Sequence, residues 1–126
     1  MDYKLIRPCS NCPFRSDLPA SQRGWLNHRI VEIVENTVLG NSTFTCHKTL
    51  KGEWNEDEEG NGYYTPSQGE QHCAGALIMA NNVGRLWHNQ ATRMAERFGM
   101  FDFDKLDTSA PVFKTVDECY DFHEAE

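Results

Sequence analysis

The residues best suited to chemistry in this chain are four of its five cysteines. Cys9 and Cys12 form a C-x-x-C pair, and the turn between them places two thiolates within reach of one metal ion. Cys46 follows a short β-prone segment, and Cys73 precedes an alanine-rich apolar run. We predict that Cys9, Cys12, Cys46 and Cys73 form a four-sulfur metal site built from distant parts of the sequence.

Two metals suit this set of ligands. Zinc binds four thiolates tetrahedrally, and we favour it, although its usual ligands come as two C-x-x-C pairs and only one is present here. One pair and two single cysteines, with Pro13 directly after Cys12, also suit a [4Fe-4S] cluster. Either His47 or His72 could replace its neighbouring cysteine as a ligand, or donate an N–H to that cysteine's sulfur.

Catalytic interpretations of the cysteines are less well supported. A thioredoxin-type dithiol would follow a strand and open a long helix, whereas Pro8 and Pro13 bracket this pair. A zinc deaminase needs an H-x-E segment before its C-x-x-C, and none precedes Pro8. The chain has no P-loop, dinucleotide fingerprint, H-E-x-x-H or G-x-S-x-G motif, which favours a non-enzymatic role. The fifth cysteine, Cys119, is expected to be an ordinary core residue.

Composition limits the classes of partner and compartment. The 126 residues predict one domain, residues 1–126, in which a metal would contribute much of the stability. We expect a cytoplasmic protein, because no secretory h-region and no bilayer-spanning segment is present, and a reducing compartment favours thiolate ligands over disulfides. The net charge of −7 disfavours broad binding to nucleic acid, although a local basic face stays open.

The elements that must position the cysteines are mostly helical. The fold class predicted is α+β, mainly helical with short strands, in a small single domain organised around the Cys-rich metal site. Ser21 can cap a helix whose apolar residues recur from Leu26 to Val38, and Gly40 lies just past its end. A second helix is predicted to begin after Cys73, where small residues would let it pack closely against a metal centre.

Two further helices and several short strands complete the prediction. One helix covers residues 85–98 and ends before Gly99, and another follows the capping box formed by Thr115 and Glu118. Brief strands are predicted at residues 42–46, 63–64 and 112–113. Residues 51–71 are acidic and glycine-rich, which predicts a surface loop.

Four motifs of the chain, taken together, resemble those of a known family. They are P-C-x-x-C-P-F-R at residues 8–15, F-x-C-H-K-T at 44–49, C-A-G at 73–75 and H-N-x-x-x-R at 88–93. In this order they resemble a family of small uncharacterised proteins of bacteriophages and bacteria. The resemblance implies that the four cysteines correspond to the family's cysteines. It also implies that Arg15, His47, Asn89 and Arg93 are recurring polar positions that face a ligand or surround the metal.

Three functions therefore stay open. The first is a metal-binding phage or host-associated accessory protein that contacts a host or phage protein, for instance through its acidic loop. The second is a redox or nucleic-acid-linked [4Fe-4S] protein in which Arg15, Arg93 and Arg97 form an anion-binding face. The third is a zinc hydrolase, which needs a histidine ligand, an open coordination position and a general base such as Glu70.

Overall fold

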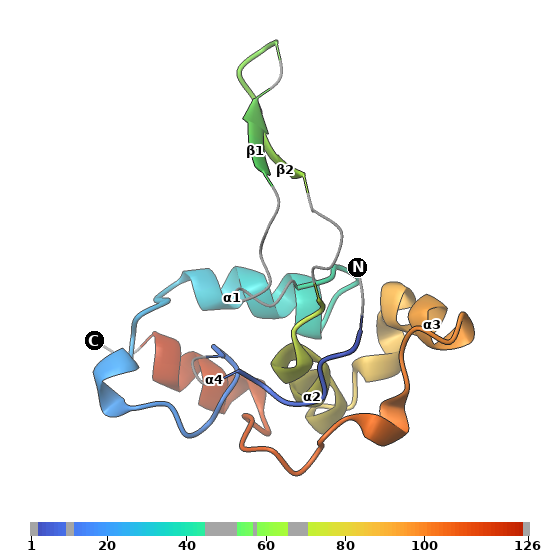
Figure 1. The fold of residues 1–126 in the computed structure, drawn as a ribbon. Helices are drawn as coiled ribbons and strands as arrows, with labels where there is room; N and C mark the ends of the chain where they lie inside the picture. Colours follow the sequence, from blue (N-terminus) through green and yellow to red (C-terminus); the bar gives the residue numbers. More distant parts are fainter. Residues whose placement is uncertain (1–2, 10–11, 45–52, 57, 66–70, 125–126) are drawn as a thin grey trace.

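The computed structural model describes residues 3–9, 12–44, 53–56, 58–65 and 71–124. Its longer helices are α1 (Arg29–Ile33), α2 (Ala74–Asn82), α3 (Gln90–Arg97) and α4 (Val116–His123). A π-helical turn, η2 (Val34–Val38), continues α1 directly, and short 3-10 turns cover Ala20–Gln22, Leu86–His88 and Phe103–Lys105. Helix α2 lies at the centre of the body, between α4 on one side and α3 on the other (Figure 1).

The predicted α+β class is wrong, because the body of the protein is helical. Among the described residues, the only paired strands are β1 (Glu53–Glu56) and β2 (Gly62–Thr65), which form an antiparallel hairpin. The hairpin extends away from the helices, so it adds no layer to the core (Figure 1). The predicted strand at 63–64 is therefore present within β2, but in a hairpin where a surface loop was expected.

Within the described residues, neither of the other two predicted strands joins a sheet. Residues 112–113 form only an isolated bridge, between Val112 and Arg15, and the Phe113 N–H donates to the carbonyl of Phe14. Residues 42–44 pair with no strand, and residues 45–46 lie outside the described part of the chain. Nor is the domain organised around a metal site in the part described, where no group of three or more His, Cys, Asp or Glu could hold a metal ion.

The core is organised around α2 instead. This helix is apolar on every side, and its residues from Ala74 to Ala80 are all buried. A helix with no polar face has to be covered all round, which explains its central place. The side chains that surround it come from most of the other elements and include Phe14, Ile30, Val34, Val38, Leu86, Phe101, Val112, Phe113 and Cys119. Burial of each larger one contributes roughly 1.5–3 kcal/mol.

The first helix begins seven residues later than a cap at Ser21 predicts. Gly24 (φ 81°) and Asn27 (φ 50°) both have left-handed backbone conformations, which interrupt a right-handed helix. Ser21 lies in a 3-10 turn instead, and α1 begins at Arg29. Because Gly24 is not part of a helix, its N–H can donate to the carbonyl of Phe122 at 2.8 Å, and this bond ties the segment to α4.

The other three helices are present, although residues 86–88 of the helix predicted at 85–98 form a separate 3-10 turn and α3 begins only at Gln90. Asn89 caps α3 by accepting the Thr92 N–H at 3.2 Å, and Gly99 (φ 74°) lies just past its end. Thr115 accepts the Glu118 N–H at 3.2 Å, as the capping box predicts. No helix in the described ranges is both long and apolar enough to cross a membrane.

Candidate metal centre

The C-x-x-C segment forms a tight turn whose second cysteine points into the core. The Cys12 N–H donates to the Cys9 carbonyl at 3.2 Å, and the Arg15 N–H donates to the Cys12 carbonyl at 3.1 Å. Cys12 and Phe14 are both fully buried, whereas Cys9 is partly exposed. The turn is therefore fixed by its own backbone and by the burial of the Phe14 ring next to it.

Cys73 reaches the same place from the start of α2. It is the residue that precedes the helix, and its sulfur lies 3.5 Å from that of Cys12. The hydrogen bond from the Cys12 thiol lowers the pKa of Cys73, and the N–H groups of Ala76 and Gly75 lower it further, against the opposing effect of burial. The beginning of a helix thus stabilises a thiolate at Cys73.

Cys12 is the proton-bearing partner of this pair. Its hydrogen bonds to Cys73 and to Cys9, together with burial, raise its pKa, while the Phe14 N–H acts in the opposite direction. The thiols of Cys9 and Cys73 are therefore both linked to that of Cys12, although the three do not form a group that could hold a metal ion as they lie in the described structure. Metal binding would require these thiols to lose their protons.

Gly75 makes this close approach feasible. A Cβ atom at this position would overlap the Cys12 sulfur, and would also touch the Cβ atoms of Phe14 and Pro8 at 3.4 and 3.5 Å. The C-A-G motif thus has a physical reason, because the helix can pack against the C-x-x-C turn only where residue 75 has no side chain. This agrees with the close packing expected from the small residues after Cys73.

His72 is not available as a metal ligand in this arrangement. Its Nδ1 lies 3.1 Å from the Cys73 carbonyl, which can only accept, so Nδ1 carries the hydrogen. Its Nε2 then accepts the Phe44 N–H at 3.4 Å. Burial lowers the pKa of His72 to about 4, and its ring stacks on that of Tyr3 at 5.1 Å. His72 is thus a neutral residue that ties Phe44 to the start of α2.

The four polar residues implied by the family resemblance do not gather at one place. Arg15 lies at the cysteines: its Nη1 donates to the Cys9 carbonyl at 3.2 Å, and its guanidinium pairs with Asp17 at 2.7 Å. Asn89 is buried and structural, since its Nδ2 donates to the Ser42 carbonyl at 3.0 Å while its Oδ1 caps α3. Arg93 is exposed on α3, and His47 lies outside the described residues.

Arg93 lines a surface cavity with Trp87, Glu96 and Arg97. None of these residues makes a described contact with a cysteine, whereas Arg15 lies beside Cys9.

Cys46 also lies outside the described residues, but the chain that leads to it is described up to Phe44. The Cys73 N–H donates to the Phe44 carbonyl at 2.7 Å, and the Phe44 ring meets that of Phe14 edge-on at 5.5 Å. The chain therefore runs past both Cys73 and the C-x-x-C turn two residues before Cys46.

Sequence reasoning missed one contact that holds the turn in place. The fully buried His123 of α4 lies with Nε2 2.6 Å from the Pro13 carbonyl, so Nε2 is the donor. Its Nδ1 is buried without a partner among the described residues, and burial lowers the pKa of His123. These residues are 110 positions apart, and no motif links them. Cys119, one turn earlier on α4, is the core residue expected, and burial raises its pKa to about 12.

Comparison of the chain with protein-family models, with curated proteins and with solved structures gives no match.

Proposed function

We propose that this protein is a structural zinc-binding module in which Cys9, Cys12, Cys46 and Cys73 bind one zinc ion. The observation that carries the proposal is the buried pair of sulfurs from Cys12 and Cys73, 3.5 Å apart. The N–H groups of Phe14, Gly75 and Ala76 are directed at these two sulfurs. Such donors stabilise thiolates, which are the form of cysteine that binds metal.

The sulfur separation favours one zinc ion over an iron-sulfur cluster. Zinc–sulfur bonds of about 2.3 Å in a tetrahedron place two sulfurs about 3.8 Å apart, close to the observed distance. In a [4Fe-4S] cluster each thiolate binds a different iron, so the whole cluster has to fit between the sulfurs. A separation of 3.5 Å leaves no room for that. The iron-sulfur alternative would require Cys12 and Cys73 to move apart.

Cys46 is the candidate fourth ligand on grounds of chain length alone. The Phe44 carbonyl accepts a hydrogen bond from the backbone of Cys73, and Cys46 follows two residues later. Two residues span at most about 7 Å, which keeps Cys46 in reach of the other three sulfurs. The Arg15 guanidinium, held beside Cys9, would offset part of the negative charge that four thiolates bring to one divalent ion.

A zinc ion held by four thiolates has no open coordination position, which supports a structural role. A hydrolase would need a histidine ligand in place of one cysteine, and both ring nitrogens of His72 already contact the backbone. The ion would instead join the C-x-x-C turn to the beginning of the central helix α2. We propose that the resulting module acts by binding another protein, in a phage or host-associated setting that rests on the four-motif resemblance.

Titration with Co²⁺ under anaerobic conditions tests this proposal, because cobalt replaces zinc and reports its ligands by absorbance. We expect a sulfur-to-cobalt charge-transfer band and tetrahedral d–d bands that saturate at about one ion per chain. Cys12→Ser and Cys73→Ser should lose these bands, whereas Cys119→Ala should keep them. Identical spectra for all three variants would reject the site, and octahedral bands without charge transfer would reject thiolate ligation.

A further inference from the structure

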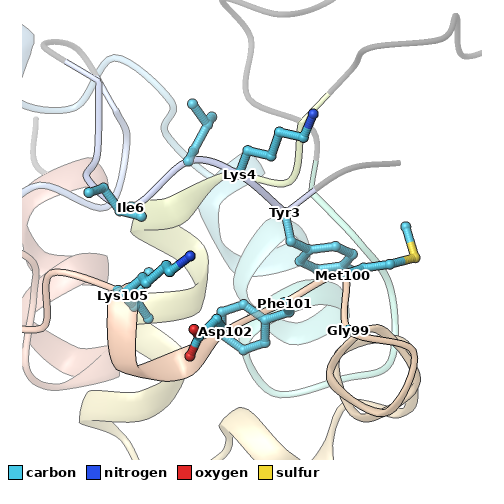
Figure 2. A pocket seen from close by; sticks show the side chains of 10 residues that line it. Tyr3, Lys4, Ile6, Gly99, Met100, Phe101, Asp102 and Lys105 are labelled. Carbon is cyan, nitrogen blue, oxygen red and sulfur yellow. The ribbon is translucent and has the colours of Figure 1, made fainter.

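One end of the molecule exposes most of the large apolar side chains that remain on the described surface. Ile6, Trp87, Met94, Phe98 and Met100 are between 40 and 68 % exposed. Exposed apolar patches of this kind mark interaction sites. The patch is also hollowed, since a cavity of about 310 Å³ lies between residues 3–6 and residues 99–106 (Figure 2).

Neighbouring cavities extend this hollow along α3. The first cavity shares Gly99, Phe101 and Asp102 with a second one, which in turn shares Trp87 and Glu96 with a third. The three cavities therefore lie next to one another, and we call them together the α3 groove.

Cations border the groove without carboxylate partners. Lys4 and Lys105 line its first cavity, and Arg93 and Arg97 line its last. Within the described residues, the ion pairs shorter than 4.0 Å are those of Arg7 with Asp107 and of Arg15 with Asp17, so these four cations have none. On a chain of net charge −7, an apolar groove bordered by four unpaired cations fits an acidic protein segment that carries apolar side chains.

The exposed face of α3 carries a stripe of arginines beside a stripe of apolar residues, which narrows the kind of segment that the groove would bind. Arg93 and Arg97 are one turn apart, and so are Met94 and Phe98 on the adjoining stripe of the same exposed face. An occupant with both acidic and aromatic residues could contact both stripes. Three carboxylates, those of Glu96, Asp102 and Asp104, interrupt the cationic border, and this works against a nucleic acid, which would present phosphates along its whole length.

The hairpin is a segment of this chain with that composition. Its sequence contains Trp54, Tyr63 and Tyr64 among acidic residues, and Glu56, Glu58 and Glu59 are exposed. The strands β1 and β2 contact chiefly each other, and the hairpin extends from the body (Figure 1). An isolated two-stranded hairpin is only marginally stable in water, so this one needs a surface to pack on.

We propose that the hairpin of one copy docks on the α3 groove of a second copy, and that the exchange is reciprocal in a twofold-symmetric dimer. Each protomer then supplies one acidic hairpin and one cation-bordered groove, so the dimer closes with two equivalent interfaces. The proposal needs the folded protein but does not depend on the zinc site, because none of the four proposed zinc ligands lines the groove or belongs to the hairpin.

Sedimentation velocity of the full chain over about 5–200 µM tests for this dimer. We expect dimerisation that weakens at least about tenfold as salt rises from about 50 to 500 mM, because opposite charges make the interface. Two double variants should each be monomeric: Arg93→Glu with Arg97→Glu in the groove, and Glu56→Lys with Glu58→Lys in the hairpin. A matched control, Arg23→Glu with Arg29→Glu, changes the same charge elsewhere and should dimerise like the natural chain.

Mixing the two charge-reversed variants is the decisive step. In a dimer of either variant alone, like charges face each other at both interfaces. In a mixed dimer of the two variants, opposite charges face each other at both interfaces. We expect a dimer to reappear only in the mixture, at a one-to-one ratio. A monomeric natural chain at the highest concentration would overturn the proposal. So would a dimer that both reversals leave intact, or variants that remain monomeric after mixing although circular dichroism shows them folded.

Discussion

Substituting Gly75 by alanine tests the close packing of α2 against the C-x-x-C turn. This packing and the helix propensity of alanine predict opposite changes in the free energy of unfolding. Gly75 lies in the first turn of α2, and alanine in place of glycine within a helix normally stabilises by about 1 kcal/mol. Here the new Cβ would overlap the Cys12 sulfur. Overpacking of this kind costs about 1–3 kcal/mol in a well-packed core.

The cost should lie near the upper end of that range, because Cys12 cannot easily yield. It is fully buried, its backbone is bonded within the turn, and the next residue, Pro13, accepts the hydrogen bond from His123. Subtracting the propensity gain leaves a net loss of about 2 kcal/mol, which corresponds to a fall in Tm of roughly 6–10 °C for a domain of this size.

Urea denaturation and thermal melting of the metal-loaded protein measure this difference. Asn81→Ala, near the other end of α2, is the matched control, and we expect it to be neutral or to stabilise by a few tenths of a kcal/mol. Gly75→Ala should also weaken Co²⁺ binding, because it pushes Cys12 away from Cys73. If Gly75→Ala raised the free energy of unfolding, the close packing of α2 against the C-x-x-C turn would be refuted.

Three other predictions concern the cap of α3, the buried His123 and the two buried cysteines of the candidate metal centre. Asn89→Ala should cost about 1–3 kcal/mol in urea denaturation, since it removes the cap of α3 and the bond to Ser42, whereas Gln90→Ala should cost almost nothing. Burial lowers the pKa of His123, so the unfolded chain binds its proton first, and stability should fall as pH drops below about 6.5 towards the folded pKa. His123→Gln should reduce that pH dependence between about pH 8 and 5, and an unchanged slope would exclude His123 as its source. Replacing Cys12 or Cys73 by serine should lower the free energy of unfolding by several kcal/mol and make that free energy insensitive to chelators. The Cys119→Ala protein should show neither effect.

Helix positions were largely predictable because their signals are local. Apolar periodicity and capping residues predicted α3 and α4, although α3 begins at Gln90 and not at residue 85, and the apolar run after Cys73 predicted α2. The start of α1 was wrong because Gly24 and Asn27 have left-handed backbones, and the Gly24 N–H bonds to α4, a contact that no local pattern reveals. The hairpin was hidden by its acidic composition, which resembles that of a solvated loop.

The site was predictable in its residue types and only partly in its geometry. The motifs identified Cys12 and Cys73, and the structure brings their sulfurs to 3.5 Å. Sequence could not decide the role of His72, because that depends on which backbone groups meet its two nitrogens. The bond from His123 to Pro13 joins residues 110 positions apart, and a single sequence gives no sign of such a pair.

Metal analysis of the protein purified anaerobically without added metal is the most direct test of the central claim. The account predicts a colourless protein with about one zinc per chain, no labile sulfide, and loss of the metal in Cys12→Ser and Cys73→Ser but not in Cys119→Ala. A brown protein with several irons and labile sulfide would contradict the zinc assignment and mean that the two sulfurs separate around a cluster. A folded protein without stoichiometric metal would contradict the metal centre itself.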